Sequence, residues 1–145
     1  MKVLFIGGTG LISQAVSRLA VERDIDLYLY NRGKHGKFVP DGAKVIKGDI
    51  RDVKASKKIL REYEFDVVVD WVAFTTDHIQ ADLEIFKGIT DQYIFISSAS
   101  AYQKPLADYL VTESTPLANP YWQYSRDKIA CENLLMKEYR ENGFP

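Results

Sequence analysis

The chain opens with a short apolar run that leads through glycines into an amphipathic segment. Residues 3–6 are consecutively apolar, a pattern typical of a strand buried on both faces of a parallel sheet. The pattern Gly7-x-x-Gly10-x-x-Ser13 follows, and from Leu11 onward apolar residues recur at helical spacing. A strand, a glycine turn and a helix start together present backbone N–H groups to an anion. This stretch therefore predicts a dinucleotide site, with a helix beginning at the last glycine, whose cofactor-binding residues are Gly7, Gly10, Leu11 and Ile12.

The end of the second expected strand departs from the usual dinucleotide-binding pattern. An acidic residue that binds the ribose 2′-hydroxyl ordinarily stands about 20 residues after the glycines, but Asn31 and Arg32 occupy that place. A carboxylate would repel a 2′-phosphate, whereas Arg32, helped by Lys34, would pair with one. The sequence therefore favours NADP over NAD, unless these charges are only solvated turn residues. At the end of the third strand, Asp49 and Ile50 either contact the adenine or simply form a turn.

Strand and helix patterns alternate along the rest of the chain. Apolar runs predict strands at residues 26–30, 45–46, 65–73 and 93–96. Helices are expected at residues 53–63 after an N-cap at Asp52, from Thr76 or Asp77 to Gly88, and from 120–122 to Gly143. This alternation predicts an α/β fold with a Rossmann-like, doubly wound parallel sheet, in one domain that spans residues 1–145. Residues 99–120 carry three prolines and no periodic pattern.

Composition narrows the classes of partner. With 145 residues, 46% of them hydrophobic, the chain can build one sizeable core. A net charge of −1 gives no broad basic surface, so we expect neither nucleic acid nor a membrane as a partner. No apolar run approaches the roughly 20 residues of a membrane-spanning helix, and no signal-peptide pattern is present, so a cytoplasmic protein is expected. Cys131 is expected to be a packed thiol, His35 a loop residue and His78 a helix-N-terminal residue, and no metal-ligand spacing is found.

A phenol and an ammonium group stand four residues apart near the end of the sequence. Tyr124 and Lys128 share one face of the expected helix. Ionising a phenol of pKa near 10 at pH 7 costs about 4 kcal/mol, and a neighbouring cation lowers such a pKa by about 1–3 units. Lys128 would therefore help Tyr124 to transfer a proton. Ser97 and Ser98 end the fifth strand, at the carboxyl edge where such sheets bind ligands, and a serine hydroxyl there would bond a substrate oxygen.

Together these motifs resemble the extended short-chain dehydrogenase/reductases, the NAD(P)-dependent epimerase/dehydratase group of nucleotide-sugar enzymes and their relatives. The resemblance runs through the glycine turn, Gly48-Asp49-Ile50, the strand 66–73, the run 96–102 and residues 124–128. It implies an oxidoreductase with an NAD(P) cofactor and a small-molecule substrate, either a nucleotide sugar or a similar hydroxyl or carbonyl compound.

The resemblance also implies a role for each site residue. In that group the catalytic Ser or Thr stands four residues before a tyrosine like Tyr102, which selects Ser98. Tyr124 would be the acid/base, and Lys128 would bind the nicotinamide ribose and lower the pKa of Tyr124. The implied catalytic residues are Ser98, Tyr124 and Lys128, and the implied cofactor-binding residues are Gly7, Gly10, Leu11, Ile12, Asn31, Arg32, Asp49, Ile50, Val72, Ala73, Phe74 and Lys128.

Besides Asn31 and Arg32 in place of the acid that NAD-preferring members carry, two features set this sequence apart from the group. Ser13 replaces the third glycine, which normally allows close packing of helix and strand; a side chain as small as serine is tolerable there, at the expense of a looser contact. Members of the group are also roughly twice as long. We therefore expect an N-terminal fragment, truncated after the fifth strand and its following helix, which lacks the C-terminal substrate domain and has little catalytic activity. Its fifth strand would be an exposed apolar sheet edge.

Two other functions on the same fold compete with an enzyme. One is a non-catalytic NAD(P)-sensing module, although a sensor has no need of the set Ser98, Tyr124 and Lys128. The other is an RNA-binding relative, because chloroplast stem-loop binding proteins resemble this group in the glycine turn, although the near-neutral charge weighs against it. The sequence leaves open the substrate, the type of reaction and whether the protein is a homo-oligomer.

Overall fold

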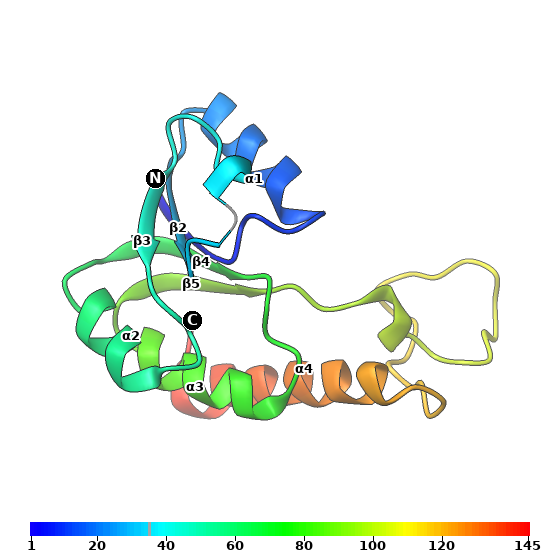
Figure 1. The fold of residues 1–145 in the computed structure, drawn as a ribbon. Helices are drawn as coiled ribbons and strands as arrows, with labels where there is room; N and C mark the ends of the chain where they lie inside the picture. The colour runs from blue at the N-terminus through cyan, green and yellow to red at the C-terminus, as the bar shows by residue number, and fades with distance from the viewer. Residues whose placement is uncertain (35) are drawn as a thin grey trace. The chain divides into compact units, whose positions relative to one another are not determined.

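The structure is a computed structural model that describes residues 1–34 and 36–145. Figure 1 shows the elements in chain order. They are β1 (Lys2–Ile6), α1 (Ser13–Glu22), β2 (Asp26–Asn31), the short 3₁₀ turn η1 (Gly36–Phe38), β3 (Lys44–Lys47), α2 (Val53–Leu60), β4 (Phe65–Asp70), α3 (Thr76–Phe86), β5 (Thr90–Phe95), the 3₁₀ turn η2 (Ala99–Ala101) and α4 (Gln123–Asn142).

The chain divides into two compact units. One, here called the sheet unit, comprises Met1–Ala73, Ala81–Ile96 and Pro145, and it contains all five strands. The other, here called the helix unit, comprises Phe74–Gln80 and Ser97–Phe144, and it contains α4.

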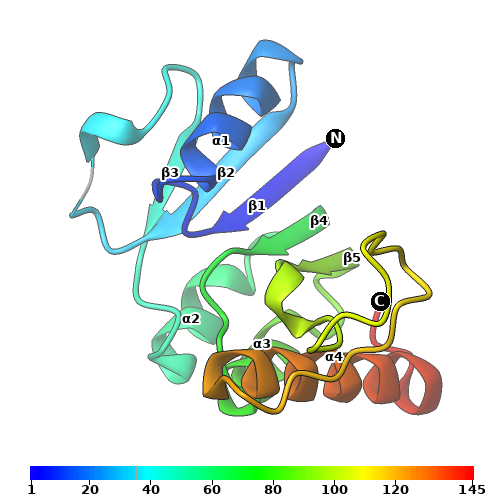
Figure 2. The same ribbon diagram turned by 90° about the vertical axis from the view of Figure 1, so that its right-hand side faces the viewer.

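The five strands form one parallel sheet in the order β3-β2-β1-β4-β5, as Figure 2 shows. β1 is the central strand, and Phe5 pairs with Leu29 on one side and Val69 on the other. A central parallel strand has both faces covered, which explains the unbroken apolar run at the start of the sequence. The predicted Rossmann-like α/β fold is confirmed.

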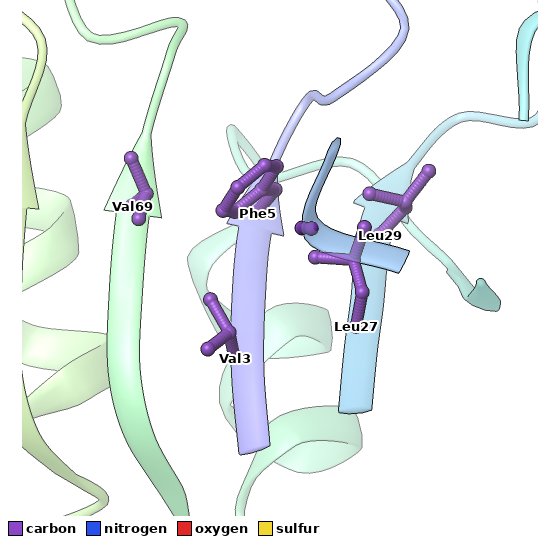
Figure 3. Packing of buried hydrophobic residues seen from close by; sticks show 6 residues of the cluster. Val3, Phe5, Leu27, Leu29 and Val69 are labelled. Atoms are coloured by element: carbon purple, nitrogen blue, oxygen red, sulfur yellow. The ribbon is translucent and has the colours of Figure 1, made fainter. Parts of the chain in front are cut away.

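Helices α1 and α2 cover opposite faces of the sheet (Figure 1). On the α1 face, apolar side chains of β1, β2 and β4 pack around Ala20 in a cluster shown in Figure 3, made up of Val3, Phe5, Ala20, Leu27, Leu29 and Val69. On the α2 face the buried Tyr30 reaches the helix, and its Oη lies 2.7 Å from Ser56 Oγ. Side chains alternate between the faces of a strand, so Leu29 packs on the α1 face and Tyr30 on the α2 face.

The structure corrects the prediction for the first helix. α1 begins at Ser13, not at Gly10, and Leu11 and Ile12 before it are 88% and 71% exposed. Its buried residues are Ser13, Ser17 and Ala20, so the helix turns its small side chains to the sheet. Small residues let the helix backbone approach the glycine turn closely, and Ser17 Oγ donates to Gly8 O at 2.8 Å. The apolar residues that recur at helical spacing in the sequence therefore lie mostly on the outward face of α1.

Most other boundaries agree with the sequence. The Asp52 side chain accepts a hydrogen bond from Ala55 N at 3.0 Å, which confirms the N-cap of α2, although that helix ends at Leu60. Gly143 ends α4 in the left-handed conformation, with φ of 64°. β5 is a sheet edge, as expected, but its Tyr93 N donates to Pro145 O at 3.0 Å, so part of that edge is paired.

β4 ends three residues before the predicted position because of an aspartate. Asp70 Oδ1 accepts hydrogen bonds from the backbone N–H groups of Val72 and Ala73, which turns the chain out of the sheet. Asp70 is fully buried, and so is Asp82. Tyr93 Oη donates to Asp82 Oδ2 at 2.7 Å and lies 3.4 Å from Asp70 Oδ2. A buried acid cluster, formed by Asp70, Asp82 and Tyr93, therefore supports the end of β4.

Burial and the adjacent Asp70 raise the pKa of Asp82 well above its ordinary value. Its Oδ1 is also buried and accepts no hydrogen bond within the described part of the chain. An ionised Asp82 would therefore leave this oxygen's share of a buried negative charge without a donor. Burial and the two carboxyl groups likewise raise the pKa of Tyr93, so its phenol remains a donor. We infer that Asp82 is protonated in the folded state.

A first prediction concerns the packing of Gly48. A Cβ atom added there would lie 2.2 Å from Tyr30 Oη, whereas one added at Gly36 would meet no heavy atom within 4 Å among the described residues. Gly48→Ala should destabilise the protein by about 1–3 kcal/mol through overpacking. Gly36→Ala, the matched control, should leave the free energy of unfolding almost unchanged. Urea unfolding of both variants tests this, and equal stability of the two would contradict the packing of Tyr30.

A second prediction concerns Asp82. The folded state holds its proton to a higher pH than the unfolded chain, so the free energy of unfolding should fall as the pH rises above the ordinary Asp pKa of about 4. Asp82→Asn removes this titration but keeps a donor towards Asp70. The variant should therefore gain stability relative to the wild type as the pH rises above about 4, measured by urea unfolding.

The control is Asp91→Asn, which makes the same substitution at an exposed position of β5. Its stability relative to the wild type should not rise in this way. Parallel pH profiles for the wild type and Asp82→Asn would show that Asp82 is not protonated in the folded state.

Candidate functional site

The glycine turn after β1 is a backbone cradle that larger residues would fill. Gly7 and Gly8 have φ of 103° and 84°, in the left-handed region that favours glycine. A Cβ atom at Gly8 would lie 2.6 Å from Leu29 Cδ2, and one at Gly7 would lie 3.2 Å from Val72 Cγ1. Gly7 N donates to Tyr30 O at 3.0 Å, which ties the turn to β2. The residues present thus fit the close backbone approach that a pyrophosphate requires.

Ser13 closes this turn and does not loosen it. Its side chain is 4% exposed, and its Oγ accepts a hydrogen bond from Gly10 N at 2.9 Å. The backbone N–H groups of Leu11 and Ile12, by contrast, make no hydrogen bond within residues 1–34 and 36–145. Two backbone donors at the start of α1 are therefore available to an anion.

The ends of β2 and β3 meet at a turn with exposed cations. Asn31 Oδ1 accepts a hydrogen bond from Gly33 N at 2.8 Å, and Asn31 O accepts one from Gly48 N at 3.0 Å. Arg32 is exposed beside it. The stem of Lys47 crosses this turn, because a Cβ atom at Gly33 would lie 3.4 Å from Lys47 Cε. His35 lies outside the described residues.

Asp49 and Ile50 lie at the end of β3 and differ in exposure. Asp49 is exposed, and its Oδ1 accepts a hydrogen bond from Arg51 N at 3.1 Å, which is a turn contact. Ile50 is buried. The loop is held from below by Tyr30, whose pKa is raised by burial, and by Ser56, whose Oγ donates to Asp49 O at 3.0 Å.

Val72 and Ala73 are held from two sides in the sheet unit. Their N–H groups donate to Asp70, and the Arg51 guanidinium donates to Val72 O. Ala73 is fully buried. The structure thus brings Val72 against Gly7 and fixes the backbone of this loop.

In the helix unit, Phe74, Tyr124 and Lys128 form one cluster. Lys128 Nζ lies 5.0 Å from the ring centroid of Phe74 and 5.8 Å from that of Tyr124, and the two ring centroids are 6.4 Å apart. The predicted shared helix face is confirmed. Lys128 is only 2% exposed, so its charge acts where water screens it little.

The two serines at the end of β5 have different partners. Ser97 Oγ donates to the Glu132 carboxylate of α4. Ser98 Oγ accepts a hydrogen bond from Ser100 N at 3.2 Å and lies 2.9 Å from Ser100 Oγ. Ser125 Oγ donates to that same Ser100 Oγ at 2.9 Å. Ser98 is thereby linked to the turn of α4 that carries Tyr124.

Two further predictions from the sequence are met in this unit. His78 lies in the first turn of α3, and its Nδ1 accepts a hydrogen bond from Phe74 N at 3.1 Å. Cys131 is buried as a free thiol.

Sequence reasoning missed four polar residues that support the site residues. They are Asp70 at the end of β4 and the group Ser100, Asn119 and Ser125. An aspartate inside an otherwise apolar run was a usable signal for Asp70. No local signal marks the other three as one group, because the hydrogen bonds that join Ser100 to Asn119 and to Ser125 span 19 and 25 residues.

Residues 1–34 and 36–145 contain neither a metal-binding cluster nor a membrane-spanning helix. No group of three or more His, Cys, Asp or Glu side chains in this part of the chain is arranged to hold a metal ion. None of the helices found in it has the length and apolar character needed to cross a membrane.

Comparison with known proteins places the chain in a family. Residues 3–145 match the NAD dependent epimerase/dehydratase family. The chain is 29% identical to a UDP-glucose 4-epimerase of Lactobacillus helveticus, over 99% of this chain and 48% of that protein. It is also 29% identical to the chloroplast stem-loop binding protein of 41 kDa b of Arabidopsis thaliana, over 94% of this chain and 39% of that protein.

A solved structure agrees on the fold. The UDP-glucose 4-epimerase of Brucella ovis in complex with NAD superposes with a TM-score of 0.85 at 22% identity, over 99% of this chain and 49% of that one. The chain spans about half the length of the relatives that it matches. With its parallel sheet, glycine turn and Tyr124–Lys128 pair, the chain belongs to the NAD dependent epimerase/dehydratase family.

Proposed function

We propose that this chain is the cofactor-binding and proton-transfer part of an NAD(P)-dependent oxidoreductase of the epimerase or dehydratase type. Its substrate would be a nucleotide sugar or a similar hydroxyl or carbonyl compound. The observation that carries the proposal is the cluster of Tyr124, Lys128 and Phe74, with Ser98 linked to the same helix turn. A protein that only senses the cofactor has no need of this cluster.

In the sheet unit, the glycine turn is proposed to hold the cofactor pyrophosphate. The N–H groups of Leu11 and Ile12 would donate to it, and Gly7 and Gly10 would allow its approach. Asp49 and Ile50 would contact the adenine. Val72 and Ala73, together with Phe74 and Lys128 of the helix unit, complete the proposed set of cofactor-binding residues.

When bound, NAD(P) supplies or accepts a hydride at a carbon atom of the substrate. The protein groups would manage the accompanying proton. Tyr124 Oη would take the proton of a substrate hydroxyl as the carbonyl forms and return it in the reverse direction. The buried Lys128 ammonium would stabilise the negative charge that develops on the phenol oxygen. Ser98 would hydrogen-bond the reacting oxygen and hold it beside Tyr124.

We propose NADP as the preferred cofactor because of the turn after β2. Arg32 is an exposed cation at the place where an acidic residue would disfavour a 2′-phosphate, and the stem of Lys47 crosses the same turn. NAD is the competing cofactor, since it is the nucleotide present in the structure of the Brucella ovis relative. The family as a whole is described as NAD dependent.

The similarity to the chloroplast stem-loop binding protein raises binding of RNA as a second candidate function. It is the weaker one, because a net charge of −1 gives little phosphate-driven affinity. A homo-oligomer and a cytoplasmic location stay predictions, as does the assignment of residues 1–145 to a single cofactor-binding domain.

A third prediction tests the cofactor. NADPH should bind more tightly than NADH, and Arg32→Gln should weaken NADPH binding by about 10- to 100-fold, as expected for loss of a charge-assisted hydrogen bond, while NADH binding stays the same. Lys54→Gln, on the exposed face of α2, is the matched control for loss of one positive charge. Calorimetric titration measures both affinities, and tighter binding of NADH by the wild type would overturn the role of Arg32.

A fourth prediction tests the acid/base. In the full protein, Tyr124→Phe should lower turnover of UDP-glucose or UDP-galactose by about 10²- to 10⁴-fold, because the variant lacks the proton-transfer group. Its affinity for the cofactor should stay the same. Tyr139→Phe, on the exposed part of the same helix, is the control and should keep full activity. Unchanged turnover in Tyr124→Phe would refute the assignment.

A further inference from the structure

Asn119 in the helix unit has an amide whose orientation is fixed by two backbone groups. Its Oδ1 accepts a hydrogen bond from Tyr121 N at 3.1 Å, and its Nδ2 donates to Ser100 O at 2.8 Å. A backbone N–H can only donate and a backbone carbonyl can only accept, so the amide has one allowed orientation. Asn119 is 7% exposed, so few water molecules compete for these bonds.

The fixed amide sets the direction of the next hydrogen bond. Asn119 Nδ2 also donates to Ser125 Oγ at 3.3 Å. Ser125 is fully buried, and its own proton goes to Ser100 Oγ at 2.9 Å. Each serine hydroxyl has one proton and two acceptor positions, so Ser100 Oγ, with one acceptor position taken by Ser125, keeps its own proton for another acceptor.

The hydroxyl of Ser98 is the next group in the network. Ser100 Oγ receives the proton of Ser125 and lies 2.9 Å from Ser98 Oγ, a pair in which either hydroxyl can be the donor. Ser98 Oγ also accepts a hydrogen bond from Ser100 N at 3.2 Å. With Ser100 as the donor of that pair, its proton would have an acceptor, and two donors would occupy both acceptor positions of Ser98 Oγ. The proton of Ser98 would then have no acceptor in this network.

We propose that Asn119, Ser125 and Ser100 are positioning residues that form a one-way hydrogen-bond chain and make Ser98 an obligatory donor. The part played by the substrate rests on the proposed function, in which Ser98 contacts the reacting oxygen. The substrate atom at Ser98 must then be an acceptor, namely a carbonyl oxygen, an alkoxide or a hydroxyl lone pair. A substrate group that could only donate, such as an ammonium, would be rejected.

The neighbouring serine shows the opposite arrangement. Ser97 Oγ donates its proton to the Glu132 carboxylate, so that hydroxyl has no proton left for a substrate. Ser97 and Ser98 thus differ in whether their proton is left for a substrate, because their hydroxyl groups have different hydrogen-bond partners.

Neutron diffraction of crystals of this chain exchanged into D₂O tests the direction of the chain without any substrate. The deuteron on Ser100 Oγ should lie on the line to Ser98 Oγ, and the deuteron of Ser98 should point away from Ser100. The deuteron of Ser97, directed to Glu132, is the internal control. A Ser98 deuteron between Ser98 Oγ and Ser100 Oγ would overturn the proposal.

Asn119→Asp should reverse the direction of the hydrogen-bond chain, because a carboxylate has the shape of the amide but can only accept hydrogen bonds. Ser125 should then donate to the introduced carboxylate, Ser100 to Ser125 and Ser98 to Ser100, so the outward deuteron of Ser98 should be lost. Should this variant fail to fold, the wild-type deuteron positions still decide the question. In the full protein, Asn119→Asp should lower kcat at least about 10-fold, as loss of one preorganised donor does, without changing cofactor affinity. An unchanged kcat would show that Ser98 does not act as the donor.

These results separate the inference from the proposed function. An outward Ser98 deuteron in a protein that binds neither NADPH nor NADH would uphold the one-way chain and refute the enzyme. An inward deuteron in a protein whose turnover depends on Tyr124 would refute only the chain.

Discussion

The structure depends on the close packing of the glycine turn between the strands that flank β1. Gly8 lies so near Leu29 that a Cβ atom there would force that side chain to shift, and a Cβ atom at Gly7 would press on Val72 in a backbone conformation that favours glycine. The Ser17 hydroxyl fixes Gly8 O from the helix side. One short turn therefore sets the spacing of β1, β2 and α1, and it leaves the N–H groups at the start of α1 for an anion. The glycine turn thus accounts both for the packing of these elements and for the proposed phosphate site.

Around this turn the protein buries polar groups at a cost to stability. Asp70 and Asp82 are both removed from water, and isolated buried carboxylates are unfavourable unless they are protonated or hydrogen-bonded. Tyr93 and the loop N–H groups supply those bonds. In return, the loop after β4 has one defined backbone path. A similar support lies under the loop after β3, where Ser56 contacts the buried Tyr30 and donates a hydrogen bond to Asp49 O. The loops after β3 and β4, which we assign to the cofactor, thus each have a buried hydrogen-bonded support beneath them.

In the helix unit, buried neighbours likewise hold the side chains of the proposed site in place. Lys128 is buried against aromatic rings, and a chain of hydroxyl groups that begins at a fixed amide leads to Ser98. In both units, the residues proposed to touch ligand are held by neighbours that do not. Such support is what keeps a reactive geometry within the narrow limits that catalysis requires.

The sequence by itself determined the elements and the broad chemistry of this protein. Apolar runs and helical spacing are local, so β1, the N-cap at Asp52, the stop at Gly143 and the shared face of Tyr124 and Lys128 were all predictable. The tertiary structure alone decided which face of α1 is buried, because that depends on how closely the helix approaches the glycine turn. It also decided the pairing of Asp70 with Asp82 and the chain from Asn119 to Ser98. Those contacts join residues on different elements, and no short-range pattern in a single sequence encodes which buried polar groups will meet.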